Sequence, residues 1–112
     1  MTMRLEIDYT ANAAYLTLHD GAVASTREVS PGVNVDIDDL DTVLGIEVLG
    51  LDVFIPYTEL TTHYHVRSGE LRALEVIRPN VTSFVARQVV PASGNGVQAI
   101  RQGEVSAEPT SV

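Results

Sequence analysis

The feature that most constrains this chain is a two-residue alternation of apolar and polar side chains in its first half. The alternation is clearest over 33–38, where valine and isoleucine alternate with asparagine and aspartate, and it recurs over 5–9 and 44–48. Successive side chains of a β-strand point to opposite faces, so this period places apolar residues on one face and carboxylates on the other. The pattern predicts strands with one buried and one solvated face.

Turn-forming residues separate these strands. Residues 15–18 and 23–29 are predicted as further strands, with Asp20-Gly21 and Pro31-Gly32 as turns between the apolar runs. Asp-Gly in particular is typical of a tight β-hairpin. Because short connections favour antiparallel pairing, we expect an N-terminal antiparallel β-meander of four to five strands.

A helical period replaces the alternation after Phe54. Apolar residues now recur every three or four positions, at Leu60, Tyr64, Leu71, Leu74 and Ile77. With Pro56 before this stretch and Pro79 after it, the spacing predicts two short helices at about 57–65 and 69–78. A sheet with one apolar face needs a cover, and we expect the helical pair to provide it.

The length of 112 residues and this order of elements indicate a single α+β domain over 1–106. We expect an acidic β-meander at 1–52, a helical pair at 53–80, and a C-terminal segment at 81–106 that forms a hairpin or an arm. The last residues, 107–112, are expected to form a flexible tail.

The predicted C-terminal hairpin rests on two apolar runs. Residues 83–90 and 97–100 are each rich in β-branched or small apolar side chains, and Ser93-Gly-Asn-Gly96 separates them. Clusters of serine, glycine and asparagine are typical of turns. The alternative is that this segment extends from the core as an arm.

The chain is acidic, and its charge is unevenly distributed. The net charge is −8 at neutral pH, and residues 1–52 account for all of it. Such a region repels nucleic acid and anionic membranes and favours basic protein partners. The absence of cysteine excludes disulfides and thiolate metal ligands.

No segment of the sequence is typical of a membrane protein. The first residues contain no apolar run of the kind found in secretory signals, and the longest uncharged stretch, 88–100, is interrupted by proline and glycine. We therefore expect a cytoplasmic protein without a membrane partner.

Several short motifs in the first half resemble a known family. Tyr9, Ala14-Tyr15, Val33-Asn-Val-Asp-Ile-Asp38 and Gly45-Ile-Glu47 are similar to the signature of the bacterial domain-of-unknown-function family 2283, over about residues 4–50. The resemblance implies a small, mostly β domain and brings no activity, cofactor or catalytic residue. The chain departs from the family at Asp39-Leu-Asp41, where the family has a glycine in the turn.

Candidate metal and catalytic residues are few. Asp36, Asp38, Asp39 and Asp41 cluster near one turn, but Leu40 stands where a calcium-binding EF-hand loop needs a ligand. His63 and His65 lie about 200° apart on the predicted helix and cannot bind one metal together. Common nucleophile, metalloprotease and phosphate-loop motifs are absent. We expect no metal, no cofactor and no enzymatic activity; an enzyme would need a pocket that joins one of these histidines to a buried carboxylate.

Residues 59–75 are similar to a DNA-binding helix-turn-helix. Leu60, Tyr64, Val66, Leu71 and Leu74 occupy its apolar positions, and Arg67, Ser68, Glu70 and Arg72 would face the DNA groove. Thr61 and His65 depart from the pattern, which has alanine and glycine at those positions. Two helices packed on a sheet would show the same apolar spacing.

These observations leave two functional interpretations. The leading one is a small non-enzymatic protein-interaction module that binds a protein partner or a second copy of itself, since a short open sheet has edges that can pair. The alternative is a helix-turn-helix DNA-binding or antitoxin-like regulator that uses residues 59–75. An exposed face that carries Arg67, Arg72 and Arg78 together would favour the alternative.

Overall fold

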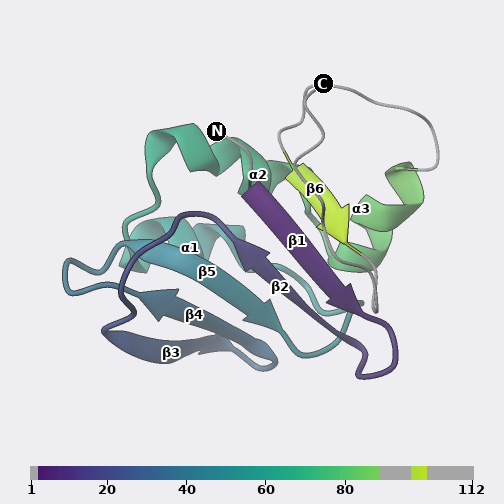
Figure 1. Ribbon diagram of the computed structural model, residues 1–112, viewed down its shortest axis with the longest axis horizontal. Coiled ribbons are helices and arrows are strands. Elements are labelled where there is room, and N and C mark those ends of the chain that lie inside the picture. The colour runs from purple at the N-terminus through teal and green to yellow at the C-terminus, as the bar shows by residue number, and fades with distance from the viewer. Residues whose placement is uncertain (1–2, 89–96, 101–112) are drawn as a thin grey trace.

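The computed structural model describes residues 3–88 and 97–100. A five-stranded antiparallel sheet comes first and three α-helices follow, all on one side of the sheet (Figure 1). The elements are β1 (Met3–Asp8), β2 (Ala13–Thr17), β3 (Ser25–Ser30), β4 (Val33–Ile37), β5 (Val43–Val48), α1 (Tyr57–His63), the 3-10 helix η1 (Ser68–Glu70), α2 (Leu71–Val76), α3 (Val81–Arg87) and β6 (Val97–Ile100). The predicted α+β fold is confirmed.

The alternation places side chains as predicted. Buried and exposed residues alternate strictly along β1, and buried residues alternate with partly exposed ones along β2 and β4. The pairing register aligns one apolar row across four strands, in the order Leu5, Leu16, Ile46 and Val35. Each of these side chains is at most 1% exposed, and full burial of such a side chain stabilises the fold by about 1.5–3 kcal/mol.

The order of the strands differs from the predicted meander. The sheet runs β3-β4-β5-β2-β1-β6, so β2 lies beside β5 instead of β3. Residues 18–24 carry the chain across to the far edge, and Asp20-Gly21 closes no hairpin. The physical reason is burial: β5 is buried at five of its six positions and takes a central place, whereas β3 has no buried residue and takes the edge.

The helices pack on the apolar face of the sheet. Leu60 of α1, Leu74 of α2 and Phe84 of α3 are all 0% exposed and belong to one core cluster with the strands. The two predicted helices are confirmed, although the first ends at His63 and the second begins as a 3-10 turn. No helix among residues 3–88 is long and apolar enough to cross a membrane.

The predicted strand over 83–90 is wrong, because residues 81–87 form α3. The Asn80 side chain accepts a hydrogen bond of 2.8 Å from the backbone N–H of Ser83 and caps the helix. Val81 and Phe84 are three positions apart and both are buried, which is a helical period.

The predicted C-terminal hairpin is therefore wrong as well. Residues 97–100 do form a strand, but β6 pairs in parallel with β1. The proposed turn at 93–96 and the tail at 107–112 lie outside the described residues.

Candidate protein-interaction surfaces

The face of the sheet that no helix covers is polar. Two rows of side chains run across its five antiparallel strands, and each row follows the pairing register. One row is Glu6, Tyr15, Glu47, Asn34 and Glu28, and the other is Arg4, Thr17, Gly45, Asp36 and Thr26. The rows contain four carboxylates and one guanidinium, so this surface is negatively charged. These rows hold four of the ten acidic residues of the first half.

Tyr15 organises the centre of this face. Its hydroxyl donates a hydrogen bond of 2.6 Å to Asp36, which also accepts one of 2.5 Å from the hydroxyl of Thr26. Partial burial and the hydrogen bond to Asp36 raise the pKa of Tyr15 far above its ordinary value, so the phenol stays neutral. The phenol thereby links β2 to β4 across β5.

Gly45 makes this link possible. A Cβ atom at position 45 would lie 2.0 Å from the Tyr15 hydroxyl oxygen, because the ring crosses β5 directly above the glycine. On the same face, the Asn34 amide donates a hydrogen bond of 3.1 Å to Glu47. Tyr15, Asp36, Gly45 and Glu47 all come from the motifs that resemble family 2283, so residues far apart in the sequence form one hydrogen-bonded surface.

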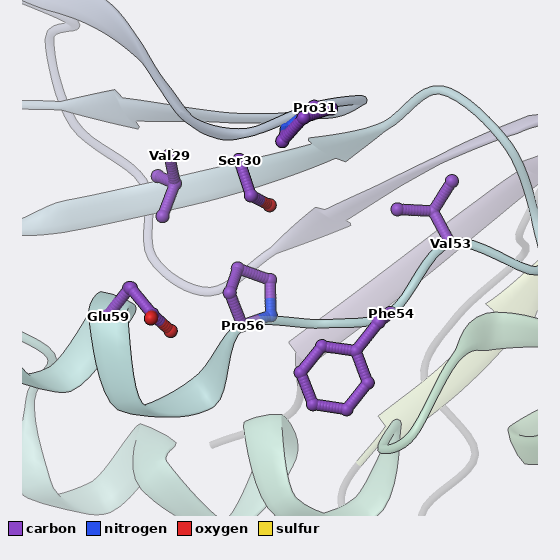
Figure 2. A pocket seen from close by; sticks show the side chains of 7 residues that line it. All are labelled: Val29, Ser30, Pro31, Val53, Phe54, Pro56 and Glu59. Carbon is purple, nitrogen blue, oxygen red and sulfur yellow. The ribbon is translucent and has the colours of Figure 1, made fainter.

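A groove opens at the β3 end of the molecule, between the sheet and the segment that leads into α1. It has a volume of about 380 Å³. Its lining residues are Val29, Ser30, Pro31, Val53, Phe54, Pro56 and Glu59, as Figure 2 shows. Five of the seven are apolar. Phe54 is 60% exposed, so the groove presents a large apolar side chain to the solvent.

Two glycines shape the wall that carries Val53. Gly32 and Gly50 have φ values of +82° and +137°, a region that residues with side chains rarely adopt. A Cβ atom on Gly50 would lie 2.7 Å from the side chain of Val53, and one on Gly32 would lie 3.5 Å from it. Val53 therefore packs over both glycines and brings the loop after β5 close to the β3–β4 turn.

The strand beside the groove is an edge of the sheet. β3 pairs with β4 alone among the described strands, and three of its six residues, Thr26, Arg27 and Glu28, are exposed. The register with β4 shifts between Glu28 and Ser30, so Val29 lies in a β-bulge and packs against the core at the groove. Bulges at sheet edges commonly redirect a side chain in this way.

Comparison with protein families identifies the segment that forms the five antiparallel strands. Residues 4–51 match the model of a family described as a protein of unknown function, DUF2283. Residues 4–51 are a DUF2283 domain. No curated protein and no solved structure gives a significant match to the chain.

The DUF2283 domain contributes only part of the groove. Val29, Ser30 and Pro31 belong to the domain, whereas Val53, Phe54, Pro56 and Glu59 follow it in the sequence. The turn at residues 39–41, where the family has a glycine, contains a left-handed residue. Asp41 has a φ of +60°, a conformation that glycine adopts without strain and that aspartate tolerates.

A buried carboxylate lies where the DUF2283 domain meets the helices. Glu70 of η1 is 2% exposed, and neither of its oxygens accepts a hydrogen bond within the part of the chain that the structure describes. His19 lies 4.0 Å away, and Arg67 contacts the ring nitrogens of His19 at 2.7 and 3.0 Å. Burial raises the pKa of the Glu70 carboxyl, and the charges of Arg67, His19 and His65 oppose that shift. The sequence indicated an exposed Glu70, and its buried position carries no local sequence signal.

The other residues predicted from the helix-turn-helix pattern are exposed, and two of the three arginines contact a neighbouring side chain within the chain. Arg67 contacts His19, the guanidinium of Arg78 lies 4.9 Å over the ring of Tyr57, and Arg72 is exposed on α2. Arg67 and Ser68 precede α2, which has six residues. The apolar positions instead pack in the core. DNA binding by Arg67, Ser68 and Arg72 stays a prediction.

The sequence offered two candidate metal clusters, the aspartates near the β4–β5 turn and the histidines at 63 and 65. The members of each cluster have different surroundings in the fold. Asp36 bonds to Tyr15 and Thr26, whereas Asp38 accepts hydrogen bonds of 2.9 and 2.8 Å from the backbone of Thr42 and Leu40, which lower its pKa. The segment at His65 is extended and pairs with the chain at Thr42, while His63 ends α1. Among the described residues, no three histidine or acidic side chains are placed to hold one metal ion.

Proposed function

We propose that this chain is a non-enzymatic protein-interaction module that binds a partner protein at the β3 edge and the groove beneath it. The observation that carries the proposal is the combination of an open edge strand with an adjacent apolar groove. An edge strand offers backbone N–H and C=O groups to a partner, and apolar pockets beside it give side-chain specificity.

The exposed apolar residues support the same surface. Phe54, which is 60% exposed, lines the groove together with Val29 and Val53. Aromatic side chains are enriched at protein interfaces, where their burial contributes much of the binding energy. Large apolar side chains grouped beside an open strand are typical of an interaction site.

Two observations disfavour the other interpretations. The Glu70 oxygens are enclosed and do not line the groove, so a substrate held there would not meet this carboxylate. Arg67 and Arg78 contact neighbours within the chain, which leaves few arginines for the several phosphate contacts that DNA binding needs.

Site-specific photo-crosslinking in the protein's own host cells tests the proposal. A photoreactive phenylalanine analogue, p-benzoylphenylalanine, replaces Phe54 in one variant and Leu40 in a control, because Leu40 is 77% exposed but does not line the groove. We expect a defined protein adduct from position 54, also after nuclease treatment, and none from position 40. Equal adducts from both positions, or none from position 54, would contradict the proposal.

A separate experiment tests the DNA-binding alternative. Under that alternative, Arg72→Ala abolishes binding to duplex DNA without a change in melting temperature. We expect the wild-type protein and Arg72→Ala to behave alike in a gel-shift titration. A selective loss of duplex binding in the variant would replace the interaction proposal with the regulator.

A further inference from the structure

We propose that the groove takes an extended, basic segment of a different protein, which adds to the sheet as a strand beside β3. This inference rests on the proposed function and specifies the partner's chemistry. An apolar side chain of the segment enters the groove, and a lysine or arginine lies opposite Glu28. The argument uses the register of the sheet, the charge of its uncovered face and the symmetry that a second copy would require.

The register determines which side chains of the added strand face each layer. Arg27 pairs with Val35 and therefore points to the helical side, whereas Glu28 pairs with Asn34 and points to the uncovered face. Residues directly opposite one another in an antiparallel pair share a face. A residue opposite Glu28 thus joins the uncovered face, and its neighbour near Val29 points toward the groove.

Charge favours a basic residue on the uncovered side. The row that ends at Glu28 continues through Asn34 to Glu47, and Asn34 already donates to the Glu47 carboxylate. A cation opposite Glu28 would extend this row with the complementary sign. The charged residue in the groove lining is also acidic, Glu59, whereas Arg27 is the cation of β3 on that helical side. The basic residue of the added strand therefore fits the uncovered face, opposite Glu28.

A second copy of the chain fits this edge poorly. A two-fold axis perpendicular to the sheet pairs each strand with itself so that opposite residues share a face. The two registers with the longest overlap then place Arg27 against Arg27 or Glu28 against Glu28. Like charges directly opposite are destabilising, and registers centred nearer the strand ends pair only half of the strand.

The size of the groove favours a single anchor over a helix. Its 380 Å³ lies near the lower end of the roughly 300–1,000 Å³ of small-molecule pockets. A bound helix needs a longer trough for anchors spaced three, four and seven residues apart. An apolar anchor within an extended segment matches both the small groove and the open strand.

Selection of peptides from a random library displayed on phage tests the chemistry. The library is panned on the wild-type protein and counter-selected on Phe54→Asp, an exposed position where the fold tolerates the change. We expect enriched peptides that alternate an apolar residue with lysine or arginine. Enrichment of acidic or amphipathic helical sequences, or no enrichment, would overturn the inference.

A charge exchange then tests the register. Glu28→Lys should weaken binding of a selected peptide by roughly five- to tenfold, and replacement of the peptide's basic residue by glutamate should restore it. Glu6→Lys is the matched control, because it makes the same charge change on the same face at β1. Equal weakening by both variants would show general attraction and would contradict the pairing with Glu28.

The outcomes separate this inference from the proposed function. A defined adduct from position 54 together with failed peptide selection would retain the interaction module and reject the basic strand. A concentration-dependent dimer in sedimentation velocity that Phe54→Asp abolishes would likewise retain the module and identify a second copy as the occupant. No adduct from position 54 would reject the proposed function itself.

Discussion

The DUF2283 domain and the helical segment that follows it differ in the burial and hydrogen bonding of one carboxylate each. In the domain, Asp36 accepts hydrogen bonds from Tyr15 and Thr26 at a partly solvated surface. In the helical segment, Glu70 is buried and neither oxygen accepts a hydrogen bond from a described residue. A satisfied polar network specifies one arrangement of strands, whereas a buried carboxylate that accepts no hydrogen bond costs stability. The comparison indicates that the fold satisfies the carboxylate of Asp36 and leaves that of Glu70 without a hydrogen bond.

The largest expected effect tests whether the two regions unfold together. Phe84→Ala removes a fully buried ring of α3 from the core that the helices share with the strands. We expect a loss of about 3–5 kcal/mol in the free energy of unfolding. Thermal unfolding followed by far-ultraviolet and near-ultraviolet circular dichroism should give one coincident transition. A separate, unchanged transition of the sheet would show that the DUF2283 domain folds independently of its cover.

A smaller loss of stability is expected when the hydrogen-bond network around Tyr15 is broken. Gly45→Ala places a methyl group on the Tyr15 ring and forces the phenol away from Asp36. We expect the free energy of unfolding to fall by about 1–3 kcal/mol, as is typical of an added methyl group without space. Urea denaturation measures this loss.

Tyr15→Ser is the matched background for that substitution. Because the ring is then absent, Gly45→Ala should cost little in the Tyr15→Ser protein, and a double-mutant cycle measures the difference. The same cost with and without the ring would contradict the role assigned to Gly45.

The third expected effect, similar in size to that of Gly45→Ala, is a gain in stability from the helical segment. Glu70→Met replaces a buried carboxylate that accepts no hydrogen bond from a described residue with an apolar side chain of similar length, and we expect a gain of about 1–3 kcal/mol at pH 7. Glu75→Met, an exposed change on α2 that removes the same charge, is the control.

The stability gain of Glu70→Met should change with pH in a defined direction. Burial raises the pKa of Glu70, so the folded protein binds the proton more tightly than the unfolded chain does. The contribution of Glu70 to stability is therefore most favourable below the ordinary carboxyl pKa and falls as the pH rises through the raised value. The advantage of Glu70→Met should be small at pH 4 and should grow as the pH rises above the ordinary carboxyl pKa. An advantage that does not change with pH would contradict a buried, titrating carboxylate.

Local patterns predicted the elements better than their arrangement. The alternation of 33–38 identified both the strand and the residues that point into the core, and the three- and four-residue spacing identified α1 and α2. For α3, the apolar run over 83–90 favoured a strand, although Asn80 directly after Pro79 is a favourable N-cap residue. The error arose because a short apolar run is compatible with a strand or a buried helix.

The sequence by itself determined the five strands of the first half, the sides that they bury, the helices α1 and α2, and the concentration of negative charge in residues 1–52. These are local properties, set by side-chain period and by residue type. Only the tertiary structure decided that β2 lies beside β5, that Tyr15 crosses Gly45 to reach Asp36, that Glu70 is buried, and that Val29 and Phe54 line one groove. Each of these depends on contacts between distant segments, and burial of the whole apolar surface selects among pairings that the local pattern leaves equally good.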